Sequence, residues 1–131
     1  MVLKGVAALV ILSGACMPLI TGCGTDQHES AATDAASRFL SALDKPAAAC
    51  EWLAPKTKEA LESPGETCGQ ALGSLQLPQG RAAGATVWSD RAQVHTDDDT
   101  LFLVELDTGW RVTAAGCRHE TEEDYQCALA D

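Results

Sequence analysis

The spacing of hydrophobic residues divides this chain into a helical half and a strand-rich half. Between Ser30 and Asp44, apolar residues recur every three or four positions, which predicts an amphipathic helix with one apolar stripe. That stripe consists of Ala32, Ala36, Phe39, Leu40 and Leu43.

Three shorter helices are expected next in the chain. Segments 46–53 and 55–61 each begin with a proline, which is tolerated at the first helical position because its missing N–H has no partner there. A Ser-Pro-Gly break at 63–65 separates them from a fourth helix over 66–75. Helices this short need tertiary support.

After residue 80 the apolar period changes to two, which is typical of strands. Turn residues such as Ser-Asp and Asp-Thr-Gly separate the strand candidates, and the third candidate is apolar enough to be central in a sheet. The four predicted strands are 85–88, 91–96, 100–106 and 110–116. The sequence therefore predicts an α+β fold, with short N-terminal helices packed on one face of a curved four-stranded antiparallel sheet.

The N-terminus has the pattern of a lipoprotein signal. Lys4 precedes an apolar run that ends in Ile-Thr-Gly-Cys at Cys23, and the run is shorter than the roughly 20 residues a membrane-spanning helix needs. We expect residues 1–22 to be a cleaved signal peptide, 23–29 a lipidated cysteine with a polar tether, and 30–131 a single domain. A two-chain diacylglycerol on Cys23 would hold the protein at the extracytoplasmic face of the cell membrane.

The charge balance restricts the classes of partner. The chain of 131 residues carries 19 acidic and 9 basic side chains, a net charge of −10. This balance argues against nucleic acid, whose phosphates require Lys and Arg. Cationic partners remain open, as does the simpler interpretation that the charge keeps the domain soluble.

Four further cysteines are expected to form two disulfides in an exported domain of this size. Four cysteines allow three connectivities, and we favour Cys50–Cys68 with Cys117–Cys127 because each pair is close in sequence. The alternative is a zinc site built from Cys117, His119 and Cys127, which an oxidising compartment disfavours.

No constellation of catalytic or cofactor-binding residues is recognisable, and we expect no cofactor. His28 falls in the predicted tether, His95 on the polar face of a strand, and His119 in an acidic loop. The aspartates at 97–99 could suggest calcium, but adjacent turn residues point in different directions, so a hairpin turn is expected. A second acidic run, 120–124, is expected to be a solvated loop within the Cys117–Cys127 segment or a dock for a basic partner.

The three tryptophans have different expected roles. Trp110 at the start of a strand is expected in the core, and Trp52 is expected to pack against the disulfide of Cys50. Trp88 lies beside a turn, where an aromatic residue at the rim of a sheet could contact a ligand or partner.

The ending Gly109-Trp110-Arg111-Val112…Cys117…Tyr125-Gln126-Cys127, with the lipobox and the cysteine spacing, resembles small lipoproteins of GC-rich Gram-positive bacteria. The helices, meander and Gly-Trp-Arg-Val strand also resemble the NTF2-like, cone-shaped α+β fold. Because that fold hosts both enzymes and binding modules, two hypotheses follow. The first is a non-catalytic binding or accessory module next to the membrane. The second is a small-molecule carrier or enzyme in which Trp88 and His95 line an NTF2-like cavity.

Overall fold

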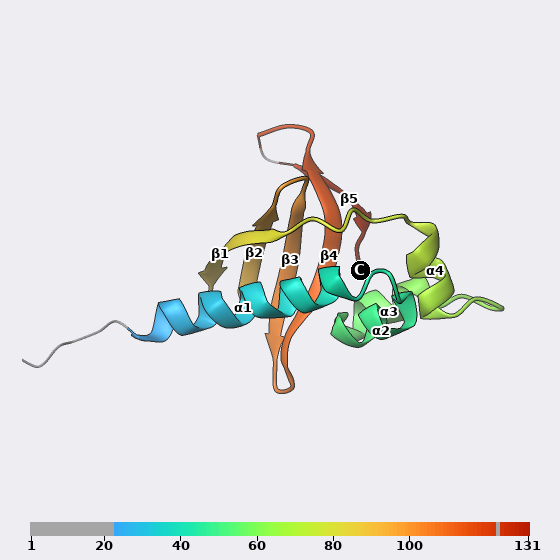
Figure 1. The fold of residues 1–131 in the computed structure, drawn as a ribbon, viewed down its shortest axis with the longest axis horizontal. Helices are drawn as coiled ribbons and strands as arrows, with labels where there is room; N and C mark the ends of the chain where they lie inside the picture. Colours follow the sequence, from blue (N-terminus) through green and yellow to red (C-terminus); the bar gives the residue numbers. More distant parts are fainter. Residues whose placement is uncertain (1–22, 123) are drawn as a thin grey trace, which may run out of the picture.

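The computed structural model describes residues 23–122 and 124–131, so the predicted signal peptide, residues 1–22, lies outside the described residues. Helices come first in the chain and strands follow (Figure 1). The helical elements are α1 (Cys23–Ser41), α2 (Pro46–Ala49), the 3₁₀ turn η1 (Cys50–Trp52), α3 (Pro55–Leu61) and α4 (Cys68–Ser74). The strands are β1 (Ala82–Trp88), β2 (Arg91–Thr96), β3 (Thr100–Leu106), β4 (Gly109–His119) and β5 (Tyr125–Leu129).

Helix α1 begins at Cys23, seven residues before the predicted start at Ser30, so the segment predicted as a tether is helical. His28, on the second turn, explains this difference. Its Nδ1 lies 3.3 Å from Oε2 of Glu105, and its ring meets Trp110 edge-on with the centroids 6.5 Å apart. These contacts hold the first turns of α1 against the sheet. The first turns are polar, so the sequence shows no apolar stripe there that would predict a helix.

The remaining helices are short and are held by local devices. Prolines begin α2 and α3 as predicted, and the Thr67 and Gln70 side chains form a reciprocal capping box at the start of α4. The Cys50–Cys68 disulfide joins η1 to α4, with the two Cα atoms 6.3 Å apart. The pairing predicted from sequence proximity is therefore present in the helical layer.

The sheet has five antiparallel strands in the order β1-β2-β3-β4-β5, so the prediction of four strands is wrong. The missed strand is β5, which pairs with the C-terminal part of β4 and places Cys127 directly opposite Cys117. Those two cysteines form the second disulfide, as predicted. Strand β5 was not predicted because it has only 5 residues and follows directly on an acidic loop.

Strand β4 is irregular, and this bends the sheet. Its register against β3 shifts twice, between Thr100 and Phe102 and again between Phe102 and Leu103. Gly116 lies at the first shift with φ +64°, a left-handed conformation that suits a bulge. Bulges increase local twist and bending, which gives β4 the curvature seen in Figure 1.

The core lies between α1 and the sheet, with the shorter helices closing one end (Figure 1). Apolar side chains from α1, α4 and the three central strands fill it: Phe39, Leu72, Val94, Leu101, Leu103 and Val112. At the lower part of β4, the η1–α3 connection takes the place of a strand, because the Ala54 N–H donates to the Val112 carbonyl at 2.8 Å. Helices therefore cover one face of the sheet and part of the β4 edge.

Candidate functional site

The face of the sheet opposite α1 carries the side chains that could meet a ligand or partner. Along β2 and β3 the buried Ala92, Val94, Leu101 and Leu103 point toward α1, so their neighbours in sequence point away from it. We call this surface the open face and define it by Trp88, Gln93, His95, Phe102, His119 and Tyr125.

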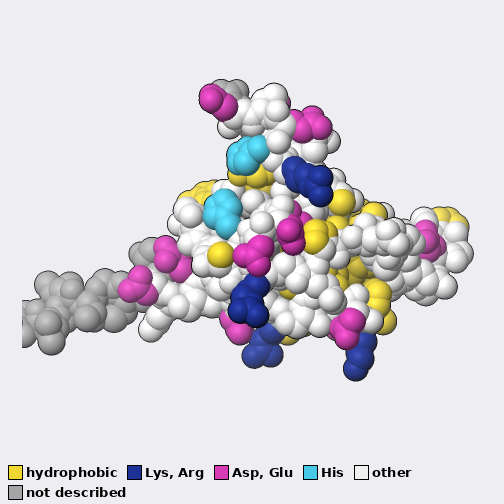
Figure 2. Space-filling model, turned by 45° about the horizontal axis from the view of Figure 1, so that its top comes forward, with side chains coloured by type: hydrophobic (Ala, Val, Ile, Leu, Met, Phe, Trp, Pro, Cys, Tyr) yellow, Lys and Arg dark blue, Asp and Glu magenta, His cyan; other side chains and the backbone are white. Residues whose placement is uncertain are grey.

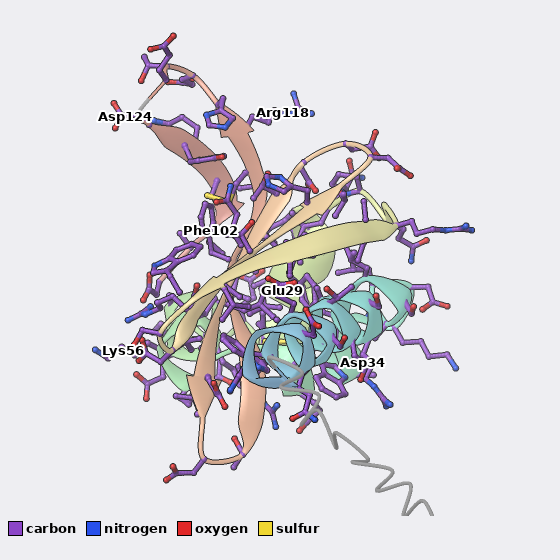
Figure 3. All side chains as sticks on the ribbon, turned by 90° about the vertical axis from the view of Figure 1, so that its left-hand side faces the viewer. Glu29, Asp34, Lys56, Phe102, Arg118 and Asp124 are labelled. Atoms are coloured by element: carbon purple, nitrogen blue, oxygen red, sulfur yellow. A yellow bond between two sulfur atoms is a disulfide. The ribbon has the colours of Figure 1, made fainter. Side chains whose placement is uncertain are left out.

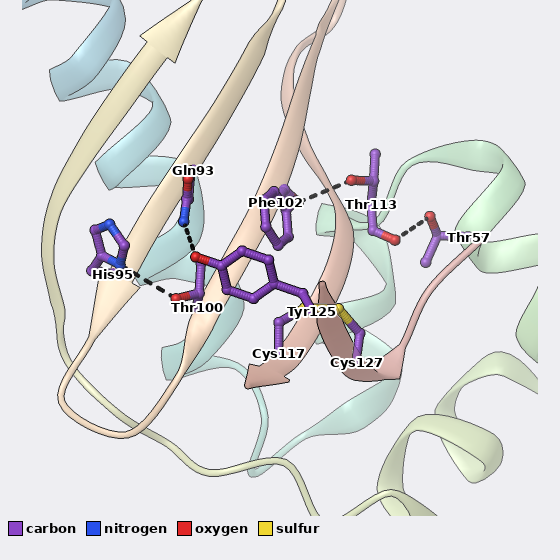
Figure 4. Close-up of a disulfide and its surroundings, with 9 residues drawn as sticks. All are labelled: Thr57, Gln93, His95, Thr100, Phe102, Thr113, Cys117, Tyr125 and Cys127. Carbon is purple, nitrogen blue, oxygen red and sulfur yellow. Dashed lines mark hydrogen bonds between the residues drawn. A yellow bond between two sulfur atoms is a disulfide. The ribbon is translucent and has the colours of Figure 1, made fainter. Parts of the chain in front are cut away.

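Tyr125 of β5 organises the middle of the open face. Its ring packs edge-on against Phe102, with the centroids 5.1 Å apart (Figure 4). The centroid of the His119 ring lies 3.9 Å from that of Tyr125. The Gln93 side-chain amide donates a hydrogen bond of 2.7 Å to the Tyr125 hydroxyl. Because the hydroxyl oxygen of Tyr125 is the acceptor of this bond, the hydroxyl can also donate its own proton to a bound group.

The structure places Trp88 and His95 on the open face but does not bring them together. Trp88 is opposite Arg91 beside the β1–β2 turn, while His95 is opposite Gly84 at the far end of the same ladder. Four residues of strand separate the two positions, about 13 Å. Trp88 is 48% exposed, and within residues 26–122 and 124–131 it is the one large hydrophobic side chain with such exposure.

His95 has the surroundings of a surface histidine. Its Nδ1 lies 3.3 Å from the Thr100 hydroxyl (Figure 4), and its ring is otherwise exposed. No carboxylate or thiol is bonded to it in the part of the chain that the structure describes. The geometry offers a hydrogen-bonding group, not an activated base.

The metal alternatives find no support in the described residues. Cys117 and Cys127 are bonded to each other, so their sulfurs are unavailable to zinc. The aspartates at 97–99 form the predicted hairpin turn, in which the Thr96 hydroxyl donates to Asp99 at 2.8 Å. Across residues 26–122 and 124–131, no three metal-binding side chains gather around one point.

Asp99 is the titratable group that this turn perturbs. Partial burial raises the pKa of its carboxyl above the ordinary value, and the neighbouring charge of Asp98 adds to the rise. The hydrogen bond from Thr96 and the charge of Arg118 oppose the rise without cancelling it. The β2–β3 turn therefore holds a carboxylate at some cost to stability.

The other tryptophans lie on the helical side of the molecule. Trp110 is buried in the core, as predicted. Trp52 is flanked by two guanidinium groups, with Arg38 Cζ 5.5 Å and Arg111 Cζ 5.3 Å from its ring centroid. These cation–π contacts connect α1, η1 and β4 and were not visible in the sequence.

The centre of the space between the helices and the three central strands is filled with side chains. Phe39, Leu101, Leu103 and Val112 are each at most 1% exposed there. Trp88 and His95 face away from this space, so neither lines it. A carrier of the NTF2-like kind would need room between helices and sheet that these side chains occupy.

Gln93, Phe102 and Tyr125 are the open-face residues that sequence reasoning missed. Two weak signals existed: Gln93 shares the polar side of the alternation with His95, and Tyr125 is two residues before a cysteine. Neither signal reveals that Tyr125 lies across the sheet against Phe102.

No protein-family model, curated protein or solved structure matches this chain. Among the residues that the structure describes, no helix combines the length and the hydrophobicity required to cross a bilayer.

Proposed function

We propose that this chain is a membrane-anchored lipoprotein of the cell surface, acylated at Cys23, whose domain binds a protein partner through the open face. We also propose kinship with the small lipoproteins of GC-rich Gram-positive bacteria and with the NTF2-like fold. The lipobox, the two disulfides and the layer of helices on a curved meander support these assignments.

One observation carries the binding role: among the residues that the structure describes, the helices pack on one face of the sheet and not on the other, which carries aromatic side chains (Figures 1 and 4). Aromatic residues are enriched at interfaces because they contribute large contact areas at a small cost in conformational entropy. The open face combines aromatic side chains, as found at the centre of an interface, with polar side chains, as found at its rim. The aromatic ones are Trp88, Phe102 and Tyr125, and the polar ones are Gln93 and His95.

The start of α1 bears on how the domain would be held at the membrane. Because the helix begins at Cys23 and is docked at His28, five residues of helix separate the acylation site from a fixed contact, about 8 Å along the axis. An anchor there would keep the domain within roughly a nanometre of the headgroups. A flexible tether would allow a larger range.

The anchor is tested by labelling cells that express the chain with a radioactive or clickable fatty acid. We expect Cys23→Ala to abolish incorporation and to accumulate unprocessed precursor. Cys16→Ala is the matched control, because Cys16 lies within the predicted signal and should leave incorporation unchanged. Labelling that persists in Cys23→Ala would refute acylation at this residue.

The open face is tested by placing a photo-crosslinking amino acid at position 88 on intact cells. We expect a discrete adduct with one protein partner, since Trp88 is exposed on the open face. Position 59, exposed on α3, is the control and should give none. Equal crosslinking from both positions would contradict a specific interface. A small molecule retained in native mass spectrometry would instead favour a carrier.

A further inference from the structure

Strand β1 forms a free edge of the sheet among the described residues. Trp88 and Arg91 flank a two-residue turn, which makes them a hydrogen-bonded pair of the β1–β2 ladder. Antiparallel pairs alternate, so Val87 and Ala85 belong to pairs that exchange no hydrogen bonds with β2. Their N–H and C=O groups point outward and can pair with another strand.

This edge lacks most of the devices that natural edges use against pairing. Its sequence, Ala-Ala-Gly-Ala-Thr-Val-Trp, contains no charged residue and no proline, and a register shift between Ala82 and Gly84 is its one irregularity. The side chains near its start are small, and a Cβ atom added at Gly84 would meet open space. A second backbone can therefore approach β1 closely.

A groove runs between this edge and α1. It has a volume of about 630 Å³, and the wall formed by α1 carries Asp26, Glu29 and Asp34. The hollow continues past Ser37 into a second one of about 330 Å³ at the start of β1. Figure 3 shows β1 as the strand nearest the viewer with α1 beside it, and Glu29 labelled where the two meet.

The charge of the groove indicates what it accepts. Asp34 is paired with Arg38 at 2.9 Å, and the second hollow has one charge of each sign, Asp44 and Arg81. Asp26 and Glu29 add two carboxylates to the first hollow, beside Ala83–Ala85 of the edge. Pairing with a second copy of this chain would bring two acidic α1 helices together in a protein of net charge −10. Like charges at such an interface are unfavourable, whereas Lys or Arg side chains would complement it.

We propose that the β1 edge binds an extended, Lys- or Arg-rich segment of a partner polypeptide, which adds a sixth strand to the sheet. Backbone hydrogen bonds to Ala85 and Val87 give the register, and Asp26 and Glu29 select for cationic side chains. The backbone edge of β1 adjoins the open face at Trp88, but the proposal depends on neither the lipid anchor nor the Trp88 side chain.

The test uses the full chain with oxidised disulfides in nonionic detergent micelles. The probe is a dye-labelled heptapeptide, Lys-Thr-Lys-Val-Lys-Thr-Lys, followed by fluorescence anisotropy and by hydrogen exchange of the protein. We expect saturable binding and new protection confined to 82–88. The same peptide with alternate backbone nitrogens methylated, and its Glu-for-Lys counterpart, should both fail to bind.

Two variants separate backbone pairing from charge. Asp26→Asn/Glu29→Gln should weaken binding about three- to tenfold at low salt, while the matched Glu59→Gln/Glu62→Gln pair, exposed at the end of α3, should not. Ala85→Pro should abolish the protection because it removes an outward N–H, one that the β1–β2 ladder does not use.

Several outcomes would overturn the proposal. Equal binding of the methylated peptide would mean that charge alone acts, without strand addition. Protection elsewhere than 82–88 would place the peptide on another surface. Concentration-dependent dimers with protection of 82–88 in the absence of peptide would identify a second copy as the occupant. If Ala85→Pro fails to fold, the methylated peptide and the charge variants still decide.

Discussion

On the face of the sheet that meets α1, Val94, Leu101 and Val112 are completely buried, whereas on the open face Gln93, Phe102 and Tyr125 remain half-buried. Val94 and Leu101 are adjacent in sequence to Gln93 and Phe102 on β2 and β3, whereas Val112 comes from β4 and Tyr125 from β5. The inner set is aliphatic and packs without polar atoms. The outer set combines aromatic rings with a hydrogen-bonded amide and hydroxyl. One face therefore stabilises the fold, and the other keeps polar and aromatic groups accessible.

The two disulfides extend this contrast. Cys50–Cys68 connects helical segments of 3 and 7 residues that would not persist alone. Cys117–Cys127 joins two strands already paired through Ala115, Arg118 and His119. The disulfide of the helical layer therefore holds together helices that would not form alone, whereas the disulfide of the sheet reinforces strands that are already paired.

Removing an aromatic ring from each face is the strongest test of the contrast. Phe39 is 0% exposed under the sheet, so Phe39→Ala should lower the free energy of unfolding by about 3–5 kcal/mol. Phe102→Ala on the open face should cost less, about 1–2 kcal/mol, because part of that ring is already in water. Urea unfolding followed by circular dichroism measures both. Equal losses would show that the open face is as much a core as the inner one.

Removing each disulfide sharpens the comparison between helical layer and sheet. By loop-closure entropy, Cys50→Ala/Cys68→Ala should cost roughly 3 kcal/mol, and the second pair should cost slightly less because its loop is shorter. The distribution of the effect should differ more than its size. Hydrogen exchange should accelerate across residues 46–75 in the first variant.

In Cys117→Ala/Cys127→Ala, the acceleration of hydrogen exchange should be confined to the β4–β5 hairpin. The loop of this hairpin projects at the top of Figure 2 and carries acidic side chains. Loss of protection throughout α2–α4 in this second variant would contradict a local role for the sheet disulfide.

A smaller effect is expected at the bulge that bends β4. Gly116 has φ +64°, and a Cβ atom there would lie 3.0 Å from Leu77 Cδ2 and 3.1 Å from Ala128 Cβ. Gly116→Ala should therefore destabilise by about 2 kcal/mol through strain and crowding. Gly84→Ala is the control, because its Cβ atom meets open space and its cost should stay within about 0.5 kcal/mol. Similar unfolding midpoints for the two variants would show that the bulge yields without strain.

The sequence predicted correctly the elements whose bounds follow from local alternation, and it missed those held by contacts between residues distant in sequence. The bounds of β2 and β3 match the prediction, because alternation along the chain determines them. The first turns of α1 and the whole of β5 were missed, since His28 and Tyr125 are held by residues far away in sequence, Glu105 and Gln93.

The same reason applies to the candidate site. Strand alternation placed His95 on the polar side correctly, but no local pattern reveals that Tyr125 crosses to Phe102. Nor does the sequence show that the helices would leave that face uncovered, because the choice depends on where α1 packs. The sequence could therefore predict which residues of β2 point to the open face, but not that residues of several strands form one exposed surface there.

The smallest expected effect concerns the β2–β3 turn, where the sheet holds a charge at a cost. Because partial burial raises the folded-state pKa of Asp99 above its unfolded value, the carboxylate destabilises the fold at neutral pH. That cost is complete above the folded-state pKa and disappears as the pH falls below the ordinary value of 3.8. Asp99→Asn keeps an oxygen that can accept the Thr96 hydrogen bond and should raise the melting temperature slightly at pH 7. The gain should vanish near pH 3, and Asp97→Asn, an exposed neighbour, should show no such pH-dependent gain. A gain of equal size at both pH values would mean that charge burial is not its cause, and that the turn gains from the amide itself.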